Sequence, residues 1–437
     1  MKTKTISQNI GIVSLGCAKN LVDTEVLMRQ LGANQFKLVI DPQEKDDIGS
    51  VIINTCGFIS DAKQESIDTI LRFVYAKKIG KIDNLYVMGC LSERYKEQLR
   101  SEVPEVDDFF GVNELKKIIR SLGGKYIREL AGERTLTTPS HYAYLKIAEG
   151  CDRKCSFCSI PLIRGKHISR PFEEIVKEAV SLVRRGVKEI NLISQDTTFY
   201  GLDLYSQRKL PELLIALSEI RGLEWLRLHY TYPDGFPMEV MEIIRERSNI
   251  CKYIDIPLQH ISSRILRSMR RGIDSAGTID LINKIRTLLP GVAMRTTLIT
   301  GYPGETDKEF FELKKFIEEV KFDRLGVFAY SHEEDTRAYY LKDTVSEKVK
   351  KERVDELMAI QEQISLELNN LKIGKRMKIM IDRQENDYFI GRTEFDSPEI
   401  DNEILVPVKG KELKPGNFYS VEIYEADSFD LYGKIHD

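Results

Sequence analysis

The alternation of short apolar runs with longer amphipathic stretches limits the fold of this chain more than any other feature. It begins at IGIVSLGC, which precedes the helix-compatible LVDTEVLMRQL, and it returns at SVIINTC and NLYVMGC, each followed by another helical pattern. Continuous apolar strands of this kind are buried on both faces, and strands that are joined through helices run parallel. The sequence therefore predicts an α/β domain with a parallel sheet over residues 9–125.

A second series of such units follows the polar, turn-rich stretch 127–141, which is typical of a linker. Helical patterns such as PFEEIVKEAVSLVRRG separate its six strand candidates, which are YAYLKIAEGC, EINLISQD, EWLRLHY, KYIDIPL, VAMRTTLITG and RLGVFAY. Six consecutive strand–helix units predict an α/β fold of the partial (β/α)6, TIM-like barrel type over residues 137–370.

The last part of the chain, residues 373–437, has a different character. Short alternating strands such as RMKIMIDR and FYSVEIYEA are separated by turns such as KPGN. This pattern predicts a small antiparallel β-barrel. A chain of 437 residues is too long for one ordinary domain, and three domains account for its length.

The composition excludes several classes of protein. Hydrophobic residues make up 42% and charged residues 30% of the chain, which suits packed cores and not a disordered chain. The formal net charge of -3 argues against a polycation that binds nucleic acid along its whole length. The start, MKTKTISQNI, lacks the apolar stretch of a signal peptide, and no apolar run is long enough to cross a bilayer. We therefore expect a cytoplasmic protein without a membrane partner.

Three of the seven cysteines lie within eight residues, CDRKCSFC, directly after the first strand of the predicted barrel. Active sites of such barrels lie where the strands end, so Cys151, Cys155 and Cys158 are candidate catalytic residues and metal ligands. Zinc ribbons use two separated CxxC knuckles, and this spacing is different. Three thiolates would bind a 4Fe-4S cluster and leave one iron open to another ligand.

Three further cysteines are far apart in the sequence but occupy equivalent positions. Cys17, Cys56 and Cys90 each follow one of the three predicted strands of the first domain. Carboxyl ends of parallel strands share one edge of a sheet, so the three thiols are expected to converge there. They could instead be three independent core residues, because free cysteine is often buried. The repetition at three successive units favours a second 4Fe-4S cluster with three thiolate ligands.

The spacing C-x3-C-x2-C after a first barrel strand resembles the radical S-adenosylmethionine (SAM) enzymes. The resemblance implies that SAM chelates the open iron of the cluster in this loop. LITGYPGET resembles the segment that packs on the adenosyl part of SAM, and ISQD stands where the family contacts the methionyl amine. Arg295, on the predicted fifth strand, could meet a carboxylate or form an ion pair within the protein. The expected SAM-binding residues are Gln195, Asp196, Arg295, Gly301, Gly304 and Glu305.

Two three-cysteine sets and a terminal barrel resemble one family over nearly the whole chain, the methylthiotransferases. In that family residues 9–125 correspond to the N-terminal domain with the auxiliary cluster, 137–370 to the radical SAM core, and 373–437 to the TRAM barrel. SLGCAKNLVDTE, NTCGFI, ISQDTTFYG and DIPLQHIS are most similar to the branch that modifies a ribosomal protein. One departure is EEDT, 333–336, where relatives often have Gly in place of Asp335.

The resemblance implies methylthiolation of the β-carbon of an aspartate in small-subunit ribosomal protein number twelve, free or within the ribosomal subunit. The cofactors would be two 4Fe-4S clusters and SAM, and the electrons would come from a donor such as flavodoxin or ferredoxin. Two alternatives stay open: a transfer-RNA adenosine methylthiotransferase, and a two-cluster electron carrier. Electron carriers usually complete all four ligands of a cluster, which disfavours the second.

The charge of the terminal barrel bears on the choice of target. Residues 373–437 contain nine Lys and Arg and fourteen Asp and Glu, so the difference is 9 − 14 = −5. Proteins that bind RNA neutralise phosphates with clustered basic residues, whereas an acidic surface attracts a basic ribosomal protein. Two of the remaining candidates, Cys251 and Trp225, are expected to be structural. Four others could either line the SAM-binding pocket of the predicted barrel or be structural: Arg227, His229, Gln259 and His260.

Overall fold

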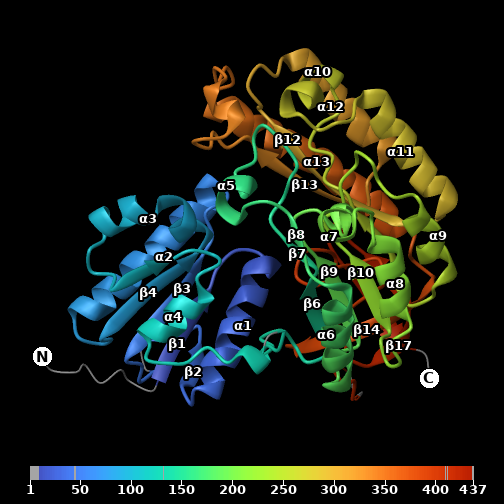
Figure 1. Ribbon diagram of the computed structural model, residues 1–437. Helices are drawn as coiled ribbons and strands as arrows, with labels where there is room; N and C mark the ends of the chain where they lie inside the picture. Colours follow the sequence, from blue (N-terminus) through green and yellow to red (C-terminus); the bar gives the residue numbers. More distant parts are fainter. Residues whose placement is uncertain (1–8, 44–45, 131, 409, 411, 436–437) are drawn as a thin grey trace, which may run out of the picture. The chain divides into compact units, whose positions relative to one another are not determined.

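The computed structural model describes residues 9–43, 46–130, 132–408, 410 and 412–435 (Figure 1). The chain packs as two compact units. The first contains residues 1–137, 149–152 and 159–168, and the second contains 138–148, 153–158 and 169–437. Residues 1–8, where no signal peptide is predicted, lie outside the described part, as do Lys409, Lys411 and Asp437 of the terminal barrel.

The described part of the first unit contains a five-stranded parallel sheet with the strand order β2-β1-β3-β4-β5. Its strands are β1 (Asn9–Ser14), β2 (Lys37–Ile40), β3 (Ser50–Thr55), β4 (Asn84–Gly89) and β5 (Asp108–Phe110). Its longer helices are α1 (Ala18–Ala33), α2 (Ser60–Lys78), α3 (Cys90–Glu102) and α4 (Leu115–Ser121), and the short helix α5 (Ile160–Arg164) also belongs to it. The predicted parallel sheet is confirmed.

Apolar residues of the central strands pack on both faces of this sheet. Val51 and Ile53 of β3 belong to one core cluster with residues of α2, while Ile52 belongs to the other with residues of α1. Successive side chains of a strand point to opposite faces, so a strand between two layers of helices needs a continuous apolar run. This is why SVIINTC has no polar alternation.

The second unit contains, in its described part, an open six-stranded parallel sheet with the order β13-β12-β11-β10-β9-β6. Its strands are β6 (Tyr142–Lys146), β9 (Glu189–Ile193), β10 (Trp225–Leu228), β11 (Ile250–Asp255), β12 (Ala293–Thr300) and β13 (Arg324–Ala329). Figure 1 shows its helices along the outside of the sheet; they include α6 (Phe172–Arg184), α8 (Leu210–Ser218), α9 (Glu239–Glu246), α10 (Ser263–Met269), α11 (Ser275–Leu288), α12 (Asp307–Val320) and α13 (Glu347–Asn370). The six predicted strand–helix units are therefore present.

The C-terminal part of the second unit is a closed five-stranded barrel in the order β14-β15-β16-β18-β17. Its strands are β14 (Arg376–Glu385), β15 (Tyr388–Arg392), β16 (Ile404–Pro407), β17 (Phe418–Ala426) and β18 (Leu431–Ile435). The pairs are antiparallel, as predicted, except that β16 and β18 run parallel. The sequence pattern did not indicate β18.

The expected linker 127–141 is partly built into the first unit. The Arg134 guanidinium donates to the Glu25 carboxylate of α1 at 2.8 Å, and both side chains are 1% exposed. The Thr137 backbone N–H donates to the same carboxylate at 2.7 Å. A buried carboxylate needs such partners, so the contacts with Glu25 fix Arg134 and Thr137. Within the described residues, no helix combines the length and the apolar character that a bilayer span requires.

Candidate functional site

The segments that carry Cys17, Cys56 and Cys90 meet at the carboxyl ends of β1, β3 and β4. A Cβ atom on Gly16 would lie 2.7 Å from the Cβ of Cys56, and one on Gly57 would lie 2.7 Å from the Leu91 Cα and 3.0 Å from the Cys90 carbonyl carbon. Only glycine fits at such a distance, and Gly16 also has a φ of +87°. The segments are therefore in direct contact, although 39 and 34 residues separate the cysteines in the sequence.

Asn20 and Arg164 hold these segments together. The Asn20 amide donates to the carbonyls of Leu15 and Thr55 at 2.9 and 3.0 Å. The Arg164 guanidinium donates to the Asn20 Oδ1 at 2.5 Å and to the Cys90 Sγ at 3.5 Å. Arg164 lies on α5, which belongs to the same unit, and no local sequence pattern pointed to it.

Two carboxylates share the charge of Arg164. Its Nη1 lies 2.9 Å from an oxygen of Asp23 and 2.9 Å from an oxygen of Glu149. The guanidinium is 2% exposed, so these ion pairs are not screened by water. One cation therefore faces a cysteine sulfur on one side and two carboxylates on the other.

The three thiols differ in pKa. Burial would raise the pKa of Cys17, but Lys19 and the backbone N–H of Asn20 outweigh this effect and lower it. Burial raises the pKa of Cys56, and it raises that of Cys90 to about 12 in spite of the opposing charge of Arg164. Charges on Cys17 and Cys56 also raise the pKa of Cys90, so the thiols lie within electrostatic reach of one another.

The spacing of these side chains bears on what they can bind. Among the described residues, no three His, Cys, Asp or Glu side chains are close enough to share a single metal ion. A single zinc ion needs all its thiolates at about 2.3 Å, whereas a cluster distributes its cysteines over different irons and so needs a wider set. Among the described residues, Cys17, Cys56 and Cys90 therefore do not form a site for a single ion.

Cys155 of the CDRKCSFC loop lies between an arginine and a tyrosine that no sequence motif indicated. The Arg271 Nη1 donates to the Cys155 Sγ at 3.2 Å, and the Tyr232 hydroxyl lies 3.4 Å from the same sulfur. The Arg271 guanidinium stacks over the Tyr232 ring at 4.2 Å and donates to the Pro257 carbonyl. Both residues are buried, so Cys155 sits in a fixed, positively charged environment.

Backbone contacts fix the rest of the loop. The Ser156 N–H donates to the Met269 carbonyl at 3.0 Å, and the Ser156 carbonyl accepts from Ala338 at 2.8 Å. The Cys151 N–H donates to the Gly165 carbonyl at 3.1 Å. Gly150 has a φ of +75°, and a Cβ there would lie 2.0 Å from the Lys166 carbonyl oxygen. The backbone at position 150, directly before Cys151, therefore accommodates only glycine.

Asp196 is fully engaged within the protein. Its Oδ2 accepts from the Arg153 Nε at 2.7 Å, its Oδ1 accepts from the Thr198 hydroxyl at 2.5 Å, and it is 1% exposed. The Arg153 guanidinium lies 3.9 Å from the centre of the Tyr232 ring. The preceding Gln195 is partly exposed at the end of β9. Asp196 thus connects this strand end to the cysteine loop through Arg153.

Glu305 stabilises the GYPGET segment. It accepts from the Gly301 N–H at 3.0 Å and from the Arg353 guanidinium at 2.5 Å, and its Oε2 lies 3.3 Å from the His260 Nε2. Burial would raise the pKa of Glu305, but His260, the Gly301 N–H and Arg353 lower it. Gly301 and Gly304 both have positive φ, and a Cβ on Gly301 would lie 2.3 Å from the Lys350 side chain. The segment is a closely packed turn directly after β12.

Arg295 has two carboxylate partners. Its Nη1 donates to the Asp255 Oδ1 at 3.1 Å, and its Nε lies 3.6 Å from the Asp401 Oδ1 of the C-terminal barrel. This is the internal ion pair that was expected from the sequence as the alternative to binding a SAM carboxylate. Asp335 has a φ of +61°, a left-handed conformation that glycine adopts more easily, so the Asp in EEDT stands at a position that favours glycine.

The remaining candidates belong mainly to the packing of the second unit. Arg227 is fully buried and paired with Glu189 at 2.9 Å, so it is a structural residue. Cys251 and Trp225 share an apolar cluster, as expected. Gln259 adopts a φ of +75° while its N–H and carbonyl bond to β12.

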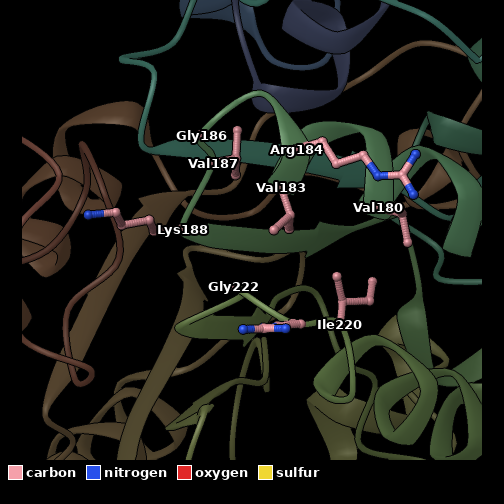
Figure 2. A pocket seen from close by; sticks show the side chains of 9 residues that line it. Val180, Val183, Arg184, Gly186, Val187, Lys188, Ile220 and Gly222 are labelled. Atoms are coloured by element: carbon pink, nitrogen blue, oxygen red, sulfur yellow. The ribbon is translucent and has the colours of Figure 1, made fainter.

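A separate pocket of about 440 Å³ opens near the amino-terminal ends of β9 and β10 (Figure 2). Val180, Val183, Lys188 and Ile220 are among its lining residues, and none of the seven cysteines is. Active sites of this fold class lie at the opposite strand ends, so this pocket is not the candidate site.

The open parallel sheet and the cysteine loop after its first strand define a radical SAM enzyme. The model of the Radical SAM superfamily matches residues 145–317, that of the uncharacterized protein family UPF0004 matches 9–111, and that of the TRAM domain matches 373–435. Among solved structures, the radical SAM methyltransferase TsrM from Kitasatospora setae aligns with a TM-score of 0.55 at 14% identity, covering 74% of this chain and 73% of that one. At this identity the likeness shows the fold alone.

Sequence relatives define the family. A protein of Cytophaga hutchinsonii is 56% identical over 98% of this chain and 97% of its own length, and one of Flavobacterium johnsoniae is 54% identical over 99% and 100%. Both are named ribosomal protein uS12 methylthiotransferase RimO. The chain belongs to the RimO family. It is a radical SAM methylthiotransferase, and it uses SAM and a 4Fe-4S cluster.

Proposed function

We propose that this enzyme adds a methylthio group to the β-carbon of an aspartate in ribosomal protein uS12, and that it does so with two 4Fe-4S clusters. Cys151, Cys155 and Cys158 would hold the radical cluster, and Cys17, Cys56 and Cys90 the auxiliary one. The observation that carries the second cluster is the contact between the three cysteine-bearing segments at Gly16 and Gly57. Three independent core cysteines would not require glycine-limited contact between their backbones.

The residues around each set fit a bound cluster. Buried guanidinium groups donate to the Cys90 and Cys155 sulfurs, and such donors stabilise the thiolate form that binds iron. A 4Fe-4S cluster with bound SAM supplies a one-electron cleavage of the sulfonium and thereby a carbon radical that can take hydrogen from an unactivated carbon. The chain's own part is to hold the thiolates, to exclude water and to position SAM.

The atoms and electrons of the overall reaction balance with two SAM molecules. One supplies the methyl group that joins sulfide and leaves as S-adenosylhomocysteine. The second leaves as methionine and 5′-deoxyadenosine, which carries away the substrate hydrogen. The C–H bond of the aspartate becomes a C–S bond, and reduction of the second sulfonium balances this oxidation. A donor such as flavodoxin or ferredoxin would supply the initiating electron.

In this proposal residues 9–125 carry the auxiliary cluster, 137–370 form the radical core, and 373–437 receive the substrate protein. The acidic surplus of the barrel supports a basic protein target, but it overstates the acidity of the surface. Asp382, Asp396 and Asp401 point inward, where they accept from His141, Arg324 and Tyr253 respectively. The names of the relatives support the choice of uS12 more strongly.

The experiment is to incubate the anaerobically reconstituted enzyme, SAM and reductant with isolated uS12 and, separately, with isopentenylated transfer RNA. We expect a methylthio mass gain on one aspartate of uS12. A gain on the RNA alone would contradict the proposal and establish the transfer-RNA alternative. A gain with assembled small subunits but not with free uS12 would identify the subunit as the substrate.

A further inference from the structure

The loop of residues 393–402, between β15 and β16, closes one end of the six-stranded sheet, and we call it the plug loop. It packs against the amino-terminal ends of the strands, opposite the cysteine loop. The Arg227 guanidinium of β10 donates to the Glu394 carbonyl at 2.6 Å, and the Tyr253 hydroxyl of β11 donates to the Asp401 Oδ2 at 2.7 Å. Tyr142 of β6 and Arg324 of β13 donate to Glu399 and Asp396.

Two routes lead from the plug loop to Asp255, the last residue of β11. In the first, the Asp401 Oδ1 lies 3.6 Å from the Arg295 Nε, and the Arg295 Nη1 donates to the Asp255 Oδ1 at 3.1 Å. In the second, the Ser397 Oγ lies 3.1 Å from the His229 Nε2, and the His229 Nδ1 lies 3.6 Å from the Asp255 Oδ2. Asp255, His229 and Ser397 are buried, so water does not replace these contacts.

Asp255 in turn holds a strained turn at the opposite edge of the sheet. The Tyr230 N–H donates to the Asp255 Oδ2 at 3.0 Å, and the Thr231 N–H donates to the Asp255 carbonyl at 2.9 Å. Tyr230 has a φ of +55°, which a non-glycine residue keeps only where its surroundings enforce it. Its carbonyl accepts from the Thr197 N–H at 3.0 Å, directly after Asp196.

The same turn sets the position of Tyr232. The Tyr232 hydroxyl lies 3.4 Å from the Cys155 Sγ, and its ring lies under the guanidinium groups of Arg153 and Arg271. A continuous series of contacts between buried or partly buried groups therefore runs from the C-terminal barrel to the cysteine loop. Supporting contacts of this kind determine how accurately a site is held.

We propose that the C-terminal barrel is a positioning element of the radical site, in addition to any role in receiving the substrate. Asp401 and Ser397 fix Asp255 through Arg295 and His229, and Asp255 holds the Tyr230 turn that places Tyr232 beside Cys155. The radical role of Cys155 in this statement rests on the proposed function. Asp401 and Ser397 are positioning residues, because their described side-chain contacts reach the cysteine loop only through other residues.

The test compares Asp401→Asn and Ser397→Ala with Glu403→Gln in the full chain. Glu403→Gln is the control, because it also removes one negative charge from the barrel but belongs to an ion pair with Arg383 outside the series. Hydrogen exchange is measured on the protein without cofactors. In both plug-loop variants we expect the amides of residues 197 and 230–231 to exchange at least about fivefold faster than in the wild type, and in the control to be unchanged.

A second readout separates positioning from general stability. After reconstitution, Asp401→Asn should raise the ratio of 5′-deoxyadenosine formed to methylthiolated product. The reason is that the radical would form in a site where Tyr232 is displaced from its position beside Cys155. Asp401→Glu, which restores the charge, should recover part of the normal ratio. If wild-type protein makes no methylthiolated product but the exchange effect is present, the proposed function fails while the positioning stands.

The inference is overturned if the plug-loop variants only lower the melting temperature and exchange at residues 197 and 230–231 stays as in the wild type. It is also overturned if Glu403→Gln produces the same exchange pattern, since the effect would then reflect barrel charge. Ser397→Ala is the milder substitution because it removes no charge. If Asp401→Asn does not fold, amide exchange in Ser397→Ala still tests the inference.

Discussion

Cys17, Cys56 and Cys90 of the first unit and Cys155 of the second unit are held by different means. In the first unit, segments from three strands touch at Gly16 and Gly57, so backbone contact sets the positions of the thiols. In the second unit, charged groups surround Cys155. Ion pairs join the plug loop to Arg295 and Arg295 to Asp255, and the buried Arg271 guanidinium donates to the Cys155 sulfur. Close backbone contact between small residues tolerates no added volume, whereas a buried charged network is most sensitive to the loss of one charged partner.

Each cysteine set also has one buried arginine that donates to a sulfur, but their counter-charges differ. Arg164 is shared with Asp23 and Glu149, so its neighbours balance its charge. Arg271 donates to the Pro257 carbonyl and stacks on Tyr232, which leaves its charge directed at Cys155. Hydrogen bonds and net charge near the sulfurs set cluster potentials, so clusters held by the two sets would differ in reduction potential.

The largest effect should come from removing either cysteine set. Alanine at Cys151, Cys155 and Cys158 should abolish 5′-deoxyadenosine formation and reduce iron from about eight to about four per chain. Alanine at Cys17, Cys56 and Cys90 should halve the iron in the same way but leave reductive cleavage of SAM intact, while sulfur transfer is lost.

Iron analysis, Mössbauer spectra and product assays check this prediction. Loss of all iron in either triple variant would show that the two sets do not hold independent clusters. Loss of SAM cleavage in the N-terminal variant, with the other cluster intact, would contradict the division of roles between the sets.

Neutralising a buried carboxylate should specifically weaken the second unit. Glu189 pairs with Arg227 at 2.9 Å and with Arg392 at 2.8 Å, and all three side chains are at most 1% exposed. Glu189→Gln should lower the free energy of unfolding at pH 7 by about 3–5 kcal/mol, because it leaves buried cations without their partner. The exposed pair Asp280–Lys284 provides the control, since Asp280→Asn should cost less than about 0.5 kcal/mol.

The pH dependence of this effect has a defined sign. Burial would raise the pKa of Glu189, but Arg392 and Arg227 outweigh it and hold the folded pKa below the unfolded value. The stabilisation is therefore present above about pH 4.3 and is lost as the pH falls through the lower, folded pKa. Urea unfolding curves from pH 7 to pH 3 should show the wild type approaching Glu189→Gln at the acid end; a constant difference would refute the assignment.

Added volume should weaken the first unit. A Cβ on Gly57 would lie 2.7 Å from the backbone of Leu91, so Gly57→Ala should destabilise by about 1–3 kcal/mol and lower the iron held by the N-terminal cysteines. Gly32→Ala is the matched control, because that position is inside α1 with nothing within 4 Å of the new atom, and it should gain up to about 1 kcal/mol. Thermal unfolding and iron analysis of both variants test this prediction. Equal effects of the two substitutions would mean that the close contact at Gly57 contributes neither to stability nor to iron binding.

The smallest expected effect concerns the two arginines. Arg271→Gln should lower the midpoint potential of the cluster at Cys155 by roughly 60 mV, the equivalent of about 1.4 kcal/mol for one charge-assisted hydrogen bond in a one-electron couple. Arg271→Lys should shift it less. The measurement is an EPR-monitored redox titration, and a potential that does not change in Arg271→Gln would rule out tuning by this residue.

The sequence predicted most of the fold, because continuous apolar strands and amphipathic helices are local patterns. It also predicted that Cys17, Cys56 and Cys90 follow strands that lie side by side, as they do in the order β1-β3-β4. Short edge elements such as β2 and β5, with four and three residues, carry too little pattern to be recognised.

The surroundings of the sites could not be predicted in the same way. Arg164 and Arg271 reach Cys90 and Cys155 across 74 and 116 residues of sequence, and a single arginine carries no signal of such a partner. Arg295 shows the converse. Its place on the fifth strand was foreseen, but the carboxylate of Asp401, more than one hundred residues later, was not.

The assignment of residues 149–152 and 159–168 to the first unit has a consequence for how such a protein can be divided. The polypeptide passes between the units five times, after residues 137, 148, 152, 158 and 168. A fragment ending at Thr137 would lack Arg164 and Glu149, and with them the guanidinium that reaches Asn20 and Cys90. The N-terminal cysteine site is therefore not a portable module: neither gene fusion nor a single proteolytic cut can transfer it whole, and its inheritance is tied to that of the radical core.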